Sequence, residues 1–244
     1  MKTLVIIPSR LSAVRLPGKP LFKINGLSII SHVFKKATEA NIGEVYVATE
    51  DKEIIDDVHV NGGQAILTDN SHKTGTDRIF DALKKLGKSD IELVMNLQGD
   101  EPLMNIEDIR KLHALMIKTK SSLGTLASNI FDKKLYKNQN AVKVITKEDL
   151  NNSEFPEAVS FMRKSINISE NIYHHLGIYC YQIKTLENFI SLSQSKNEIK
   201  NRLEQLRALD NNININVALA KSSPIGVDTK EDFMAIKKIM EYKS

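Results

Sequence analysis

The sequence has little cysteine and no long apolar run. Cys180 is the sole cysteine in 244 residues, so the chain cannot form an internal disulfide. A structural zinc site is also excluded, because there is no CxxC pair or Cys/His cluster. The first apolar run, Leu4–Ile7 before Pro8, is too short for a signal peptide, and no run approaches the roughly 18 residues that cross a bilayer. These absences predict a cytoplasmic protein without membrane insertion.

The charged residues carry no strong bias of sign. There are 34 Lys and Arg against 30 Asp and Glu, a net charge of +4, with no basic block and no basic strip interleaved with aromatics. We therefore expect no nucleic-acid partner. Hydrophobic residues make up 41% of the chain and charged residues 26%, which is typical of a globular protein with a sizeable core.

Apolar runs alternate with helical patterns in the first half of the chain. This alternation is typical of βαβ units, and it predicts an open, doubly wound, mostly parallel sheet of Rossmann-like type over residues 1 to about 130. The predicted strands are Leu4–Ile7, Val45–Thr49, Ala65–Thr68 and Leu93–Leu97. The predicted helices are Ser28–Ala40, Glu53–Asn61, Thr76–Leu86 and Ile106–Thr119.

The second half is less regular. Its Asn- and Ser-rich connections favour a smaller inserted lobe at about residues 130–190, within a single α/β domain spanning 1–244. The predicted strands are Ala141–Thr146, His175–Tyr181 and Ile215–Leu219, and the predicted helices are Lys184–Ser191, Glu198–Leu209 and Glu231–Tyr242.

A loop bearing three cations follows the first strand. Arg10, Arg15 and Lys19 lie in a segment constrained by Pro17 and Gly18. In open α/β sheets ligands bind beyond the carboxyl ends of strands, so these cations would converge on an anion such as a triphosphate. The alternative is a solvated basic loop, but the constrained backbone favours a binding site.

The common nucleotide-binding fingerprints are missing. A P-loop would place glycine five residues before Gly18 and serine or threonine after Lys19, where the chain has Ala13 and Pro20. No G-x-G-x-x-G follows a predicted strand, so an NAD-dependent dehydrogenase is a distant alternative.

Seven motifs, in this order along nearly the whole chain, resemble the 3-deoxy-manno-octulosonate cytidylyltransferase family, the CMP-Kdo synthetases. They are the cation-bearing loop and the segments Thr74–Arg78, Leu97–Pro102, Asn140–Val144, His175–Tyr179, Leu203–Arg207 and Gly226–Thr229. The resemblance implies a nucleotide-diphospho-sugar transferase-like fold. It also implies a nucleotidyltransferase that activates 3-deoxy-D-manno-octulosonate (Kdo) with CTP, giving CMP-Kdo and pyrophosphate for lipopolysaccharide synthesis.

The resemblance also assigns site residues. It implies Mg²⁺ on Asp100 and Asp228, two carboxylates that suit a metal shared with substrate phosphates. The implied catalytic cations are Lys19 and Arg10. The implied nucleotide-binding residues are Pro8, Ser9, Arg10, Arg15, Lys19, Thr74, Gly75, Thr76 and Gln98. The implied sugar-binding residues are Arg78, Gln98, Arg163, His175, Tyr179, Glu204 and Gln205.

Each assignment has a structural alternative. Asp100 could be a turn residue before Pro102, and Asp228 could be the N-cap of the final helix. Thr76 or Asp77 could cap the helix that Thr74–Arg78 opens. His175 could be a core histidine, Tyr179 a packing residue and Glu204 a solvated helix charge.

One segment departs from the family. Where the family has Tyr-Phe-Ser-Arg, this chain has Ser160-Phe161-Met162-Arg163 followed by Lys164. The change bears on which acidic 3-deoxy sugar is accepted, and an 8-amino-Kdo or a nonulosonic acid is the alternative substrate. A non-catalytic nucleotide-binding protein is a more distant alternative. The family resemblance and the apolar strands of the lobe predict a homodimer.

Overall fold

The computed structural model describes residues 1–13, 15–132, 134–163 and 170–242. Val14 of the cation-bearing loop and Lys164 lie outside the described residues. The chain folds into two compact units, with Met1–Ile109 and Pro224–Ser244 in unit 1 and Arg110–Ser223 in unit 2. The predicted lobe at 130–190 falls within the bounds of unit 2, and the single-domain description stays a prediction.

Unit 1 is built on a parallel sheet in the order β6-β1-β4-β5. These strands are β1 (Thr3–Ser9), β4 (Glu44–Thr49), β5 (Ala65–Leu67) and β6 (Leu93–Asn96). Ile6 pairs with Tyr46 on one side and Asn96 on the other. Leu4–Ile7 is fully buried, as expected for a strand covered on both faces. The predicted α/β class with a mostly parallel sheet is confirmed.

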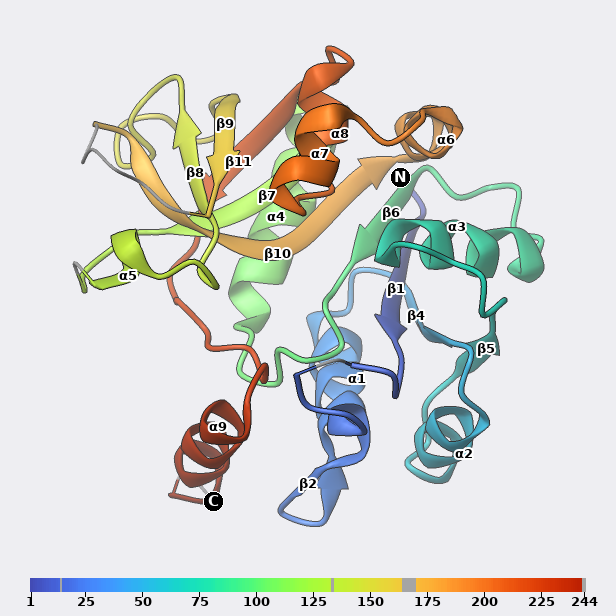
Figure 1. The fold of residues 1–244 in the computed structure, drawn as a ribbon. Coiled ribbons are helices and arrows are strands. Elements are labelled where there is room, and N and C mark those ends of the chain that lie inside the picture. The colour runs from blue at the N-terminus through green and yellow to red at the C-terminus, as the bar shows by residue number, and fades with distance from the viewer. Residues whose placement is uncertain (14, 133, 164–169, 243–244) are drawn as a thin grey trace. The chain divides into compact units, whose positions relative to one another are not determined.

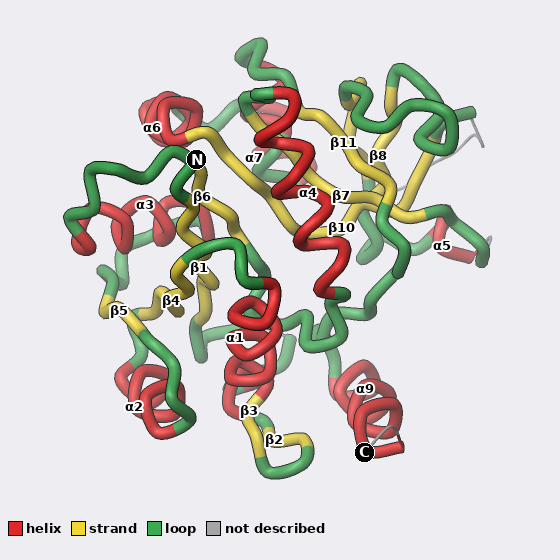
Figure 2. Tube along the Cα trace, turned by 180° about the vertical axis from the view of Figure 1, so that it is seen from behind, coloured by secondary structure: helices red, strands yellow, loops and turns green. Residues whose placement is uncertain are grey.

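The helices of unit 1 are α1 (Ile29–Ala40), α2 (Lys52–Val60), α3 (Gly75–Leu86) and α9 (Lys230–Tyr242). The chain moves from β1 through α1 to β4 and through α2 to β5, then returns through α3 to β6 on the other side of β1. Right-handed crossovers therefore place α1 and α2 on one face and α3 on the opposite face, as Figures 1 and 2 show. The strand order reverses between β1 and β6, which is where open α/β sheets bind ligands.

A short 3-10 helix η1 (Lys19–Leu21) and a hairpin of β2 (Lys23–Ile24) and β3 (Leu27–Ser28) connect β1 to α1. Against this segment packs α9, whose Ile236 is buried with Ile24 and Val227. The Phe22 and Phe233 rings meet edge to face at 5.2 Å. This packing fixes the end of the chain beside the loop that follows β1.

Unit 2 holds a mixed sheet. The chain enters it within α4 (Ile106–Thr119), and the strands are β7 (Leu123–Ser128), β8 (Lys143–Thr146), β9 (Ala158–Met162), β10 (Ile172–Gln182) and β11 (Ile215–Leu219). β11 runs parallel to β7, whereas β10 is antiparallel to both β7 and β8, and β9 is antiparallel to β8. The helices are α5 (Lys134–Lys137), α6 (Ile183–Ser191), α7 (Lys196–Asn201) and α8 (Leu206–Asp210).

The predicted single helix Glu198–Leu209 is wrong. Arg202 adopts φ +53°, which ends α7, and a turn separates it from α8. The spacing of apolar residues predicts one continuous helix, but the chain turns at Arg202. A buried ion pair, from Arg207 to Glu198 at 2.6 and 2.9 Å, joins the two short helices. Strands β7 and β9 are also absent from the sequence predictions. Across the described ranges, no helix is long and apolar enough to cross a membrane.

Candidate active site

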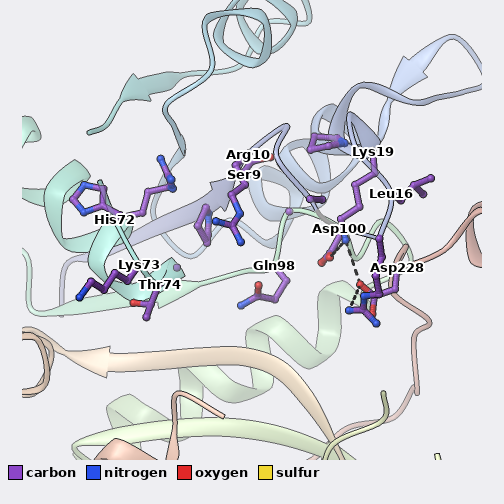
Figure 3. Close-up of a pocket in the computed structure, with 17 residues that line it drawn as sticks. Ser9, Arg10, Leu16, Lys19, His72, Lys73, Thr74, Gln98, Asp100 and Asp228 are labelled. Atoms are coloured by element: carbon purple, nitrogen blue, oxygen red, sulfur yellow. Dashed lines mark hydrogen bonds and ion pairs between the residues drawn. The ribbon is translucent and has the colours of Figure 1, made fainter. Parts of the chain in front are cut away.

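Unit 1 contains a pocket of about 420 Å³ at the reversal point of its strand order. Loops from the carboxyl ends of β1 and β6, the start of α3 and the segment before α9 form its wall (Figure 3). The lining includes the predicted residues Pro8, Ser9, Arg10, Arg15, Lys19, Thr74, Gly75, Arg78, Gln98, Asp100 and Asp228. Most of the nucleotide- and metal-binding residues predicted from sequence thus meet in one cavity.

Lys19 lies at the centre of an ionic cluster in this pocket. Its Nζ is 2.5 Å from Asp100 Oδ2 and 3.3 Å from Asp228 Oδ1, and it donates to the Val227 carbonyl at 2.6 Å. The Lys19 side chain is only 12% exposed. Arg15 completes the cluster with Nη2 at 2.9 Å from Asp228. Figure 3 shows the side chains of Lys19, Asp100 and Asp228 converging.

Backbone geometry places Lys19 there. Gly18 has φ +75°, a conformation that favours glycine, and it immediately precedes η1, which begins at Lys19. The Gly18 N–H donates to the Leu11 carbonyl at 2.9 Å, which closes the loop. Arg10 lies in the same loop and is exposed, and no ion pair to it occurs among the described residues. Its guanidinium is thus available to an anion in the pocket.

Asp228 is not the N-cap of the final helix. Thr229 takes that role, because its hydroxyl accepts from Asp232 N–H at 3.2 Å and the Asp232 carboxylate accepts from Thr229 N–H at 2.9 Å. This reciprocal pairing is a capping box. It leaves the Asp228 carboxylate to face Lys19 and Arg15, which removes the alternative interpretation of Asp228.

A third carboxyl group lies behind the cluster. Glu101 Oε2 is fully buried and has no hydrogen-bond partner in the part of the chain that the structure describes. Burial, and then repulsion by Asp100 and Asp228, raises the pKa of Glu101 to about 8, against an opposing effect of Lys19. Glu101 is therefore neutral near pH 7. Its position next to Asp100 is the one feature that could have pointed to it before the structure was known.

The donor set at the cluster fits Mg²⁺. Among the described residues there is no group of three or more His, Cys, Asp or Glu side chains placed to hold a metal. Mg²⁺ usually takes one or two carboxylates and completes its octahedron with waters and substrate phosphates. Asp100 and Asp228 face one ammonium group and provide such a pair. These two residues could hold the metal, with phosphate oxygens as the further ligands.

The start of α3 forms another part of the wall. Thr74 is its N-cap, with Thr74 Oγ1 accepting from Asp77 N–H at 3.2 Å and Asp77 Oδ2 accepting from Thr74 N–H at 3.1 Å. The capping residue is therefore Thr74, and not Thr76 or Asp77. Gly75 lines the pocket, whereas Thr76 is 2% exposed and is not part of the lining.

Arg78 is a buried member of the pocket wall. Its Nη2 is 2.5 Å from Glu50 Oε2 and its Nη1 donates to Thr68 Oγ1 at 2.7 Å. The guanidinium is thus held against the ends of β4 and β5. Arg78 therefore stabilises the pocket wall, and its charge is already paired with Glu50.

Two further residues, Gly99 and Ser9, shape the pocket wall beside β1. A Cβ atom on Gly99 would lie 2.9 Å from the Pro8 carbonyl oxygen, so only glycine permits this close approach of the β1 and β6 loops. Ser9 lines the pocket, and its buried Oγ has no hydrogen-bond partner among the described residues. A buried hydroxyl of this kind is suited to a ligand that completes its hydrogen bonding.

The predicted sugar-binding residues other than Arg78 and Gln98 lie in unit 2. His175 and Tyr179 share a face of β10, with ring centroids 5.4 Å apart. Thr125 Oγ1 donates to the Ile178 carbonyl at 2.6 Å and lies 3.0 Å from His175 Nε2. A hydroxyl has one proton, and that of Thr125 goes to the Ile178 carbonyl, so Thr125 Oγ1 accepts from His175 Nε2–H. The other ring nitrogen, Nδ1, is then the hydrogen-bond acceptor of His175. Burial, with a smaller effect of His174, lowers the pKa of His175 to about 3, so the ring is neutral.

Arg163 binds backbone rather than an open surface. Its Nε donates to the Asn201 carbonyl at 3.1 Å and its Nη2 donates to the Arg202 carbonyl at 2.9 Å. Glu204 and Gln205 lie in the turn that follows, with Gln205 at the N-cap of α8. Arg163 therefore holds the segment that carries two other predicted residues.

The departures from the family at 160 and 162 lie away from His175. Phe161 contacts the His175 ring edge to face at 5.1 Å. Side chains alternate along β9, so Ser160 and Met162 lie on the opposite face from Phe161. These two substitutions do not remove groups from the face that meets His175.

Sequence reasoning missed several pocket residues. They are Ala13, Leu16, Pro20, His72, Lys73 and Gly99. His72 could have been suspected, since it lies just before the Thr74 cap. Its Nε2 is 2.9 Å from Asp81 Oδ2.

Comparisons with known proteins identify the family. A family model described as cytidylyltransferase matches residues 4–215. The chain is 40% identical to the 3-deoxy-manno-octulosonate cytidylyltransferase of Afipia carboxidovorans, covering 98% of this chain and 96% of the relative. It is 39% identical to the enzyme of the same name from Thermodesulfovibrio yellowstonii, with 98% of both chains covered.

Solved structures agree with the sequence relatives. The structure of a CMP:2-keto-3-deoxy-manno-octonic acid synthetase complexed with CTP matches with a TM-score of 0.88 at 32% identity, covering both chains in full. A UDP-glucose pyrophosphorylase complexed with UDP-glucose matches with a TM-score of 0.76 at 14% identity, also over both full chains, which shows a shared fold. The chain therefore belongs to the 3-deoxy-manno-octulosonate cytidylyltransferase family.

Proposed function

We propose that the protein transfers a cytidylyl group from CTP to Kdo, giving CMP-Kdo and pyrophosphate for lipopolysaccharide synthesis. The single observation that carries this proposal is the cluster of Lys19 between Asp100 and Asp228, in a pocket at the reversal point of the sheet. This arrangement gives a triphosphate both cations and a place for its metal. Membership of the cytidylyltransferase family supports cytidine as the base.

The triphosphate lies along the loop after β1 in this proposal. Arg10 and Arg15 provide planar guanidinium groups for bidentate contacts to phosphate oxygens, and Lys19 provides a point charge. Ser9 Oγ and the backbone at Thr74 and Gly75 complete the nucleotide contacts, Thr76 supporting them from the core. Mg²⁺ on Asp100 and Asp228 supplies further neutralisation of phosphate charge when bound.

The reaction is an in-line substitution at phosphorus. The anomeric hydroxyl oxygen of Kdo attacks the α-phosphorus and loses its proton, and the bond from that phosphorus to the bridging oxygen of the β-phosphate breaks. Pyrophosphate leaves with the bonding electron pair. Because phosphoryl transfer depends mainly on positioning and charge neutralisation, no protein nucleophile is required. Cys180 is buried, and burial raises the pKa of its thiol well above its usual range, so it takes no part.

The residues that the family resemblance assigns to the sugar acid are Arg78 and Gln98 in unit 1 and Arg163, His175, Tyr179, Glu204 and Gln205 in unit 2. A neutral His175 offers Nδ1 as an acceptor for a sugar hydroxyl. Tyr179, Glu204 and Gln205 offer further donors and acceptors, while Arg163 holds the turn that carries the last two. Ser160 and Met162 lie on the far face of β9 from Phe161 and its His175 contact, so these two departures give no reason to favour an 8-amino-Kdo or a nonulosonic acid, and Kdo stays the expected substrate.

A substrate panel tests this function. Purified protein with Mg²⁺ is assayed for pyrophosphate release with CTP, UTP or ATP, each with Kdo, 8-amino-Kdo or a nonulosonic acid. We expect release with CTP and Kdo at least tenfold faster than with any other pair. Faster release with the amino sugar would move the alternative substrate to first place. Absence of release with every pair would favour the non-catalytic nucleotide-binding protein.

We also propose a cytoplasmic homodimer formed through the lobe at 130–190. Within this segment Phe131 is 86% exposed and Val159 is 54% exposed, so both apolar side chains are available for contact with a second copy. Light scattering at micromolar concentration should give twice the mass of the 27.4 kDa chain. A mass equal to that of one chain would contradict the dimer.

A further inference from the structure

The loop that carries Arg10, Arg15 and Lys19 is fastened at one residue. The Leu11 carbonyl accepts from both Ala13 N–H and Gly18 N–H at 2.9 Å. The Leu11 N–H donates to the Asp51 carboxylate, with Oδ2 at 2.7 Å. Leu11 therefore closes the loop on itself and ties it to the end of β4.

Asp51 is the N-cap residue of α2, but its side chain makes no capping hydrogen bond. Aspartate is among the best N-cap residues because its carboxylate usually accepts from a backbone N–H of the first turn. By contrast, the side chains of Ser28, Thr74 and Ser195 do cap α1, α3 and α7. In α2 the Asp51 carboxylate binds the Leu11 N–H instead, so the helix lacks the side-chain cap that an aspartate at this position usually provides.

The backbone of Asp51 is itself held. Its N–H donates to Thr49 Oγ1 at 3.1 Å, and Thr49 is fully buried at the end of β4. A side chain fixed at its own backbone loses little further freedom when it binds a neighbour. Asp51 thus connects the rigid sheet to the loop through two hydrogen bonds.

We propose that Asp51 is a positioning residue for the triphosphate-binding loop, a role that rests on the proposed function of that loop. A hydrogen bond from an N–H to a carboxylate is about twice as strong as a neutral one. It holds the backbone next to Arg10 in one conformation before CTP arrives, so less ordering cost falls on binding. Asp51 does not line the pocket, so it acts through Leu11 and not on the nucleotide.

Two substitutions separate this role from helix capping. Serine and asparagine are both good N-caps, so Asp51→Ser and Asp51→Asn each preserve the start of α2. The asparagine Oδ1 still reaches Leu11 N–H, whereas the serine Oγ is too close to its own backbone to do so. Glu53→Gln changes an exposed carboxylate in the first turn of the same helix and is the matched control.

The measurements are the CTP dissociation constant by calorimetry, KM and kcat, melting temperature, and amide hydrogen exchange of the peptide covering residues 9–19. For Asp51→Ser we expect about tenfold weaker CTP binding, the fold-change that loss of one charge-assisted hydrogen bond produces. KM for CTP should rise with it while kcat changes less, and the 9–19 peptide should exchange faster. Asp51→Asn should stay within about threefold of wild type, and Glu53→Gln should match it.

Unchanged CTP affinity and unchanged exchange in Asp51→Ser would overturn the proposal. An Asp51→Asn protein as impaired as Asp51→Ser, at equal melting temperature, would also overturn it, since the hydrogen bond is kept there. Failure of wild-type protein to bind CTP would instead refute the proposed function. In that case the exchange rates alone still decide whether Asp51 holds the loop.

Discussion

Replacing Lys19 by alanine removes the cation that joins the two carboxylates of the pocket. The side chain makes three contacts, to Asp100, Asp228 and the Val227 carbonyl, and is 12% exposed. Without it, Asp228 keeps Arg15 as a cationic partner, whereas Asp100 has no other ion pair among the described residues. In the proposed reaction, the same change removes a positive charge that meets the departing pyrophosphate.

The magnitudes differ for stability and for activity. Hydrogen bonds to charged groups contribute about 1.5–3 kcal/mol each when buried. Here the Asp100 and Asp228 side chains are 30% and 36% exposed, so water replaces much of what is lost. We expect the free energy of unfolding to fall by only about 1–2 kcal/mol. In contrast, kcat/KM should fall by about 10²–10³, the cost of removing one preorganised group that stabilises transition-state charge.

Steady-state pyrophosphate release over a range of CTP concentrations separates kcat from KM, and urea unfolding gives the stability. Lys23→Ala is the matched control, because Lys23 is an exposed lysine in β2 outside the pocket. We expect the control to match wild type. If Lys19→Ala raises KM but leaves kcat unchanged, Lys19 binds only the ground state, and the argument for transition-state stabilisation is refuted.

Three other predictions follow from named contacts. Asp100→Ala and Asp228→Ala should each abolish turnover and the Mg²⁺ dependence of CTP binding measured by calorimetry, while the protein still folds. EDTA should stop turnover by the wild type, and added Mg²⁺ should restore it. Near-normal activity in either variant would show that the replaced residue does not hold the metal. His175 has a pKa of about 3 when folded and about 6.5 when unfolded, so only the unfolded chain gains its proton as pH falls from about 6.5 to 3. The contribution of His175 to the free energy of unfolding is therefore complete above pH 6.5, and it should fall by roughly 1 kcal/mol per pH unit through this window. The fall should be less steep in His175→Gln. Equal slopes of stability against pH in urea unfolding of the two proteins would contradict this. Lys143→Met should lower the free energy of unfolding by about 2–3 kcal/mol, because the fully buried Lys143 ammonium donates to the carbonyls of Asn138, Ala141 and Arg163. A loss under about 0.5 kcal/mol would show that these carbonyls do not need the Lys143 ammonium as a donor.

The parts of unit 1 that follow hydrophobic periodicity were predictable. Strand β1 and helices α1 and α3 agree with the sequence within two residues at each end, because buried strands and amphipathic helices impose simple patterns. The cations of the loop after β1 were predictable for a similar reason, since a strand end in a parallel sheet directs the following loop to a ligand.

What sequence reasoning missed depends on contacts between distant residues. The break between α7 and α8 requires the pairing of Glu198 with Arg207 and the positive φ of Arg202, neither of which alters the helical spacing. The cap of α9 by Thr229 rather than Asp228 depends on which carboxylate turns toward Lys19. The anchoring contact between Leu11 and Asp51 joins residues 40 positions apart and has no local signature.

Phosphorus NMR of the complete reaction tests the central claim most directly. Wild-type protein is mixed with CTP, Kdo and Mg²⁺, and the phosphorus resonances are followed with time. The account predicts that the three CTP signals are replaced by one phosphodiester signal of a CMP-sugar and by pyrophosphate in equal amounts, and only when Kdo is present. Formation of CDP and phosphate, or of CMP and pyrophosphate without Kdo, would contradict it.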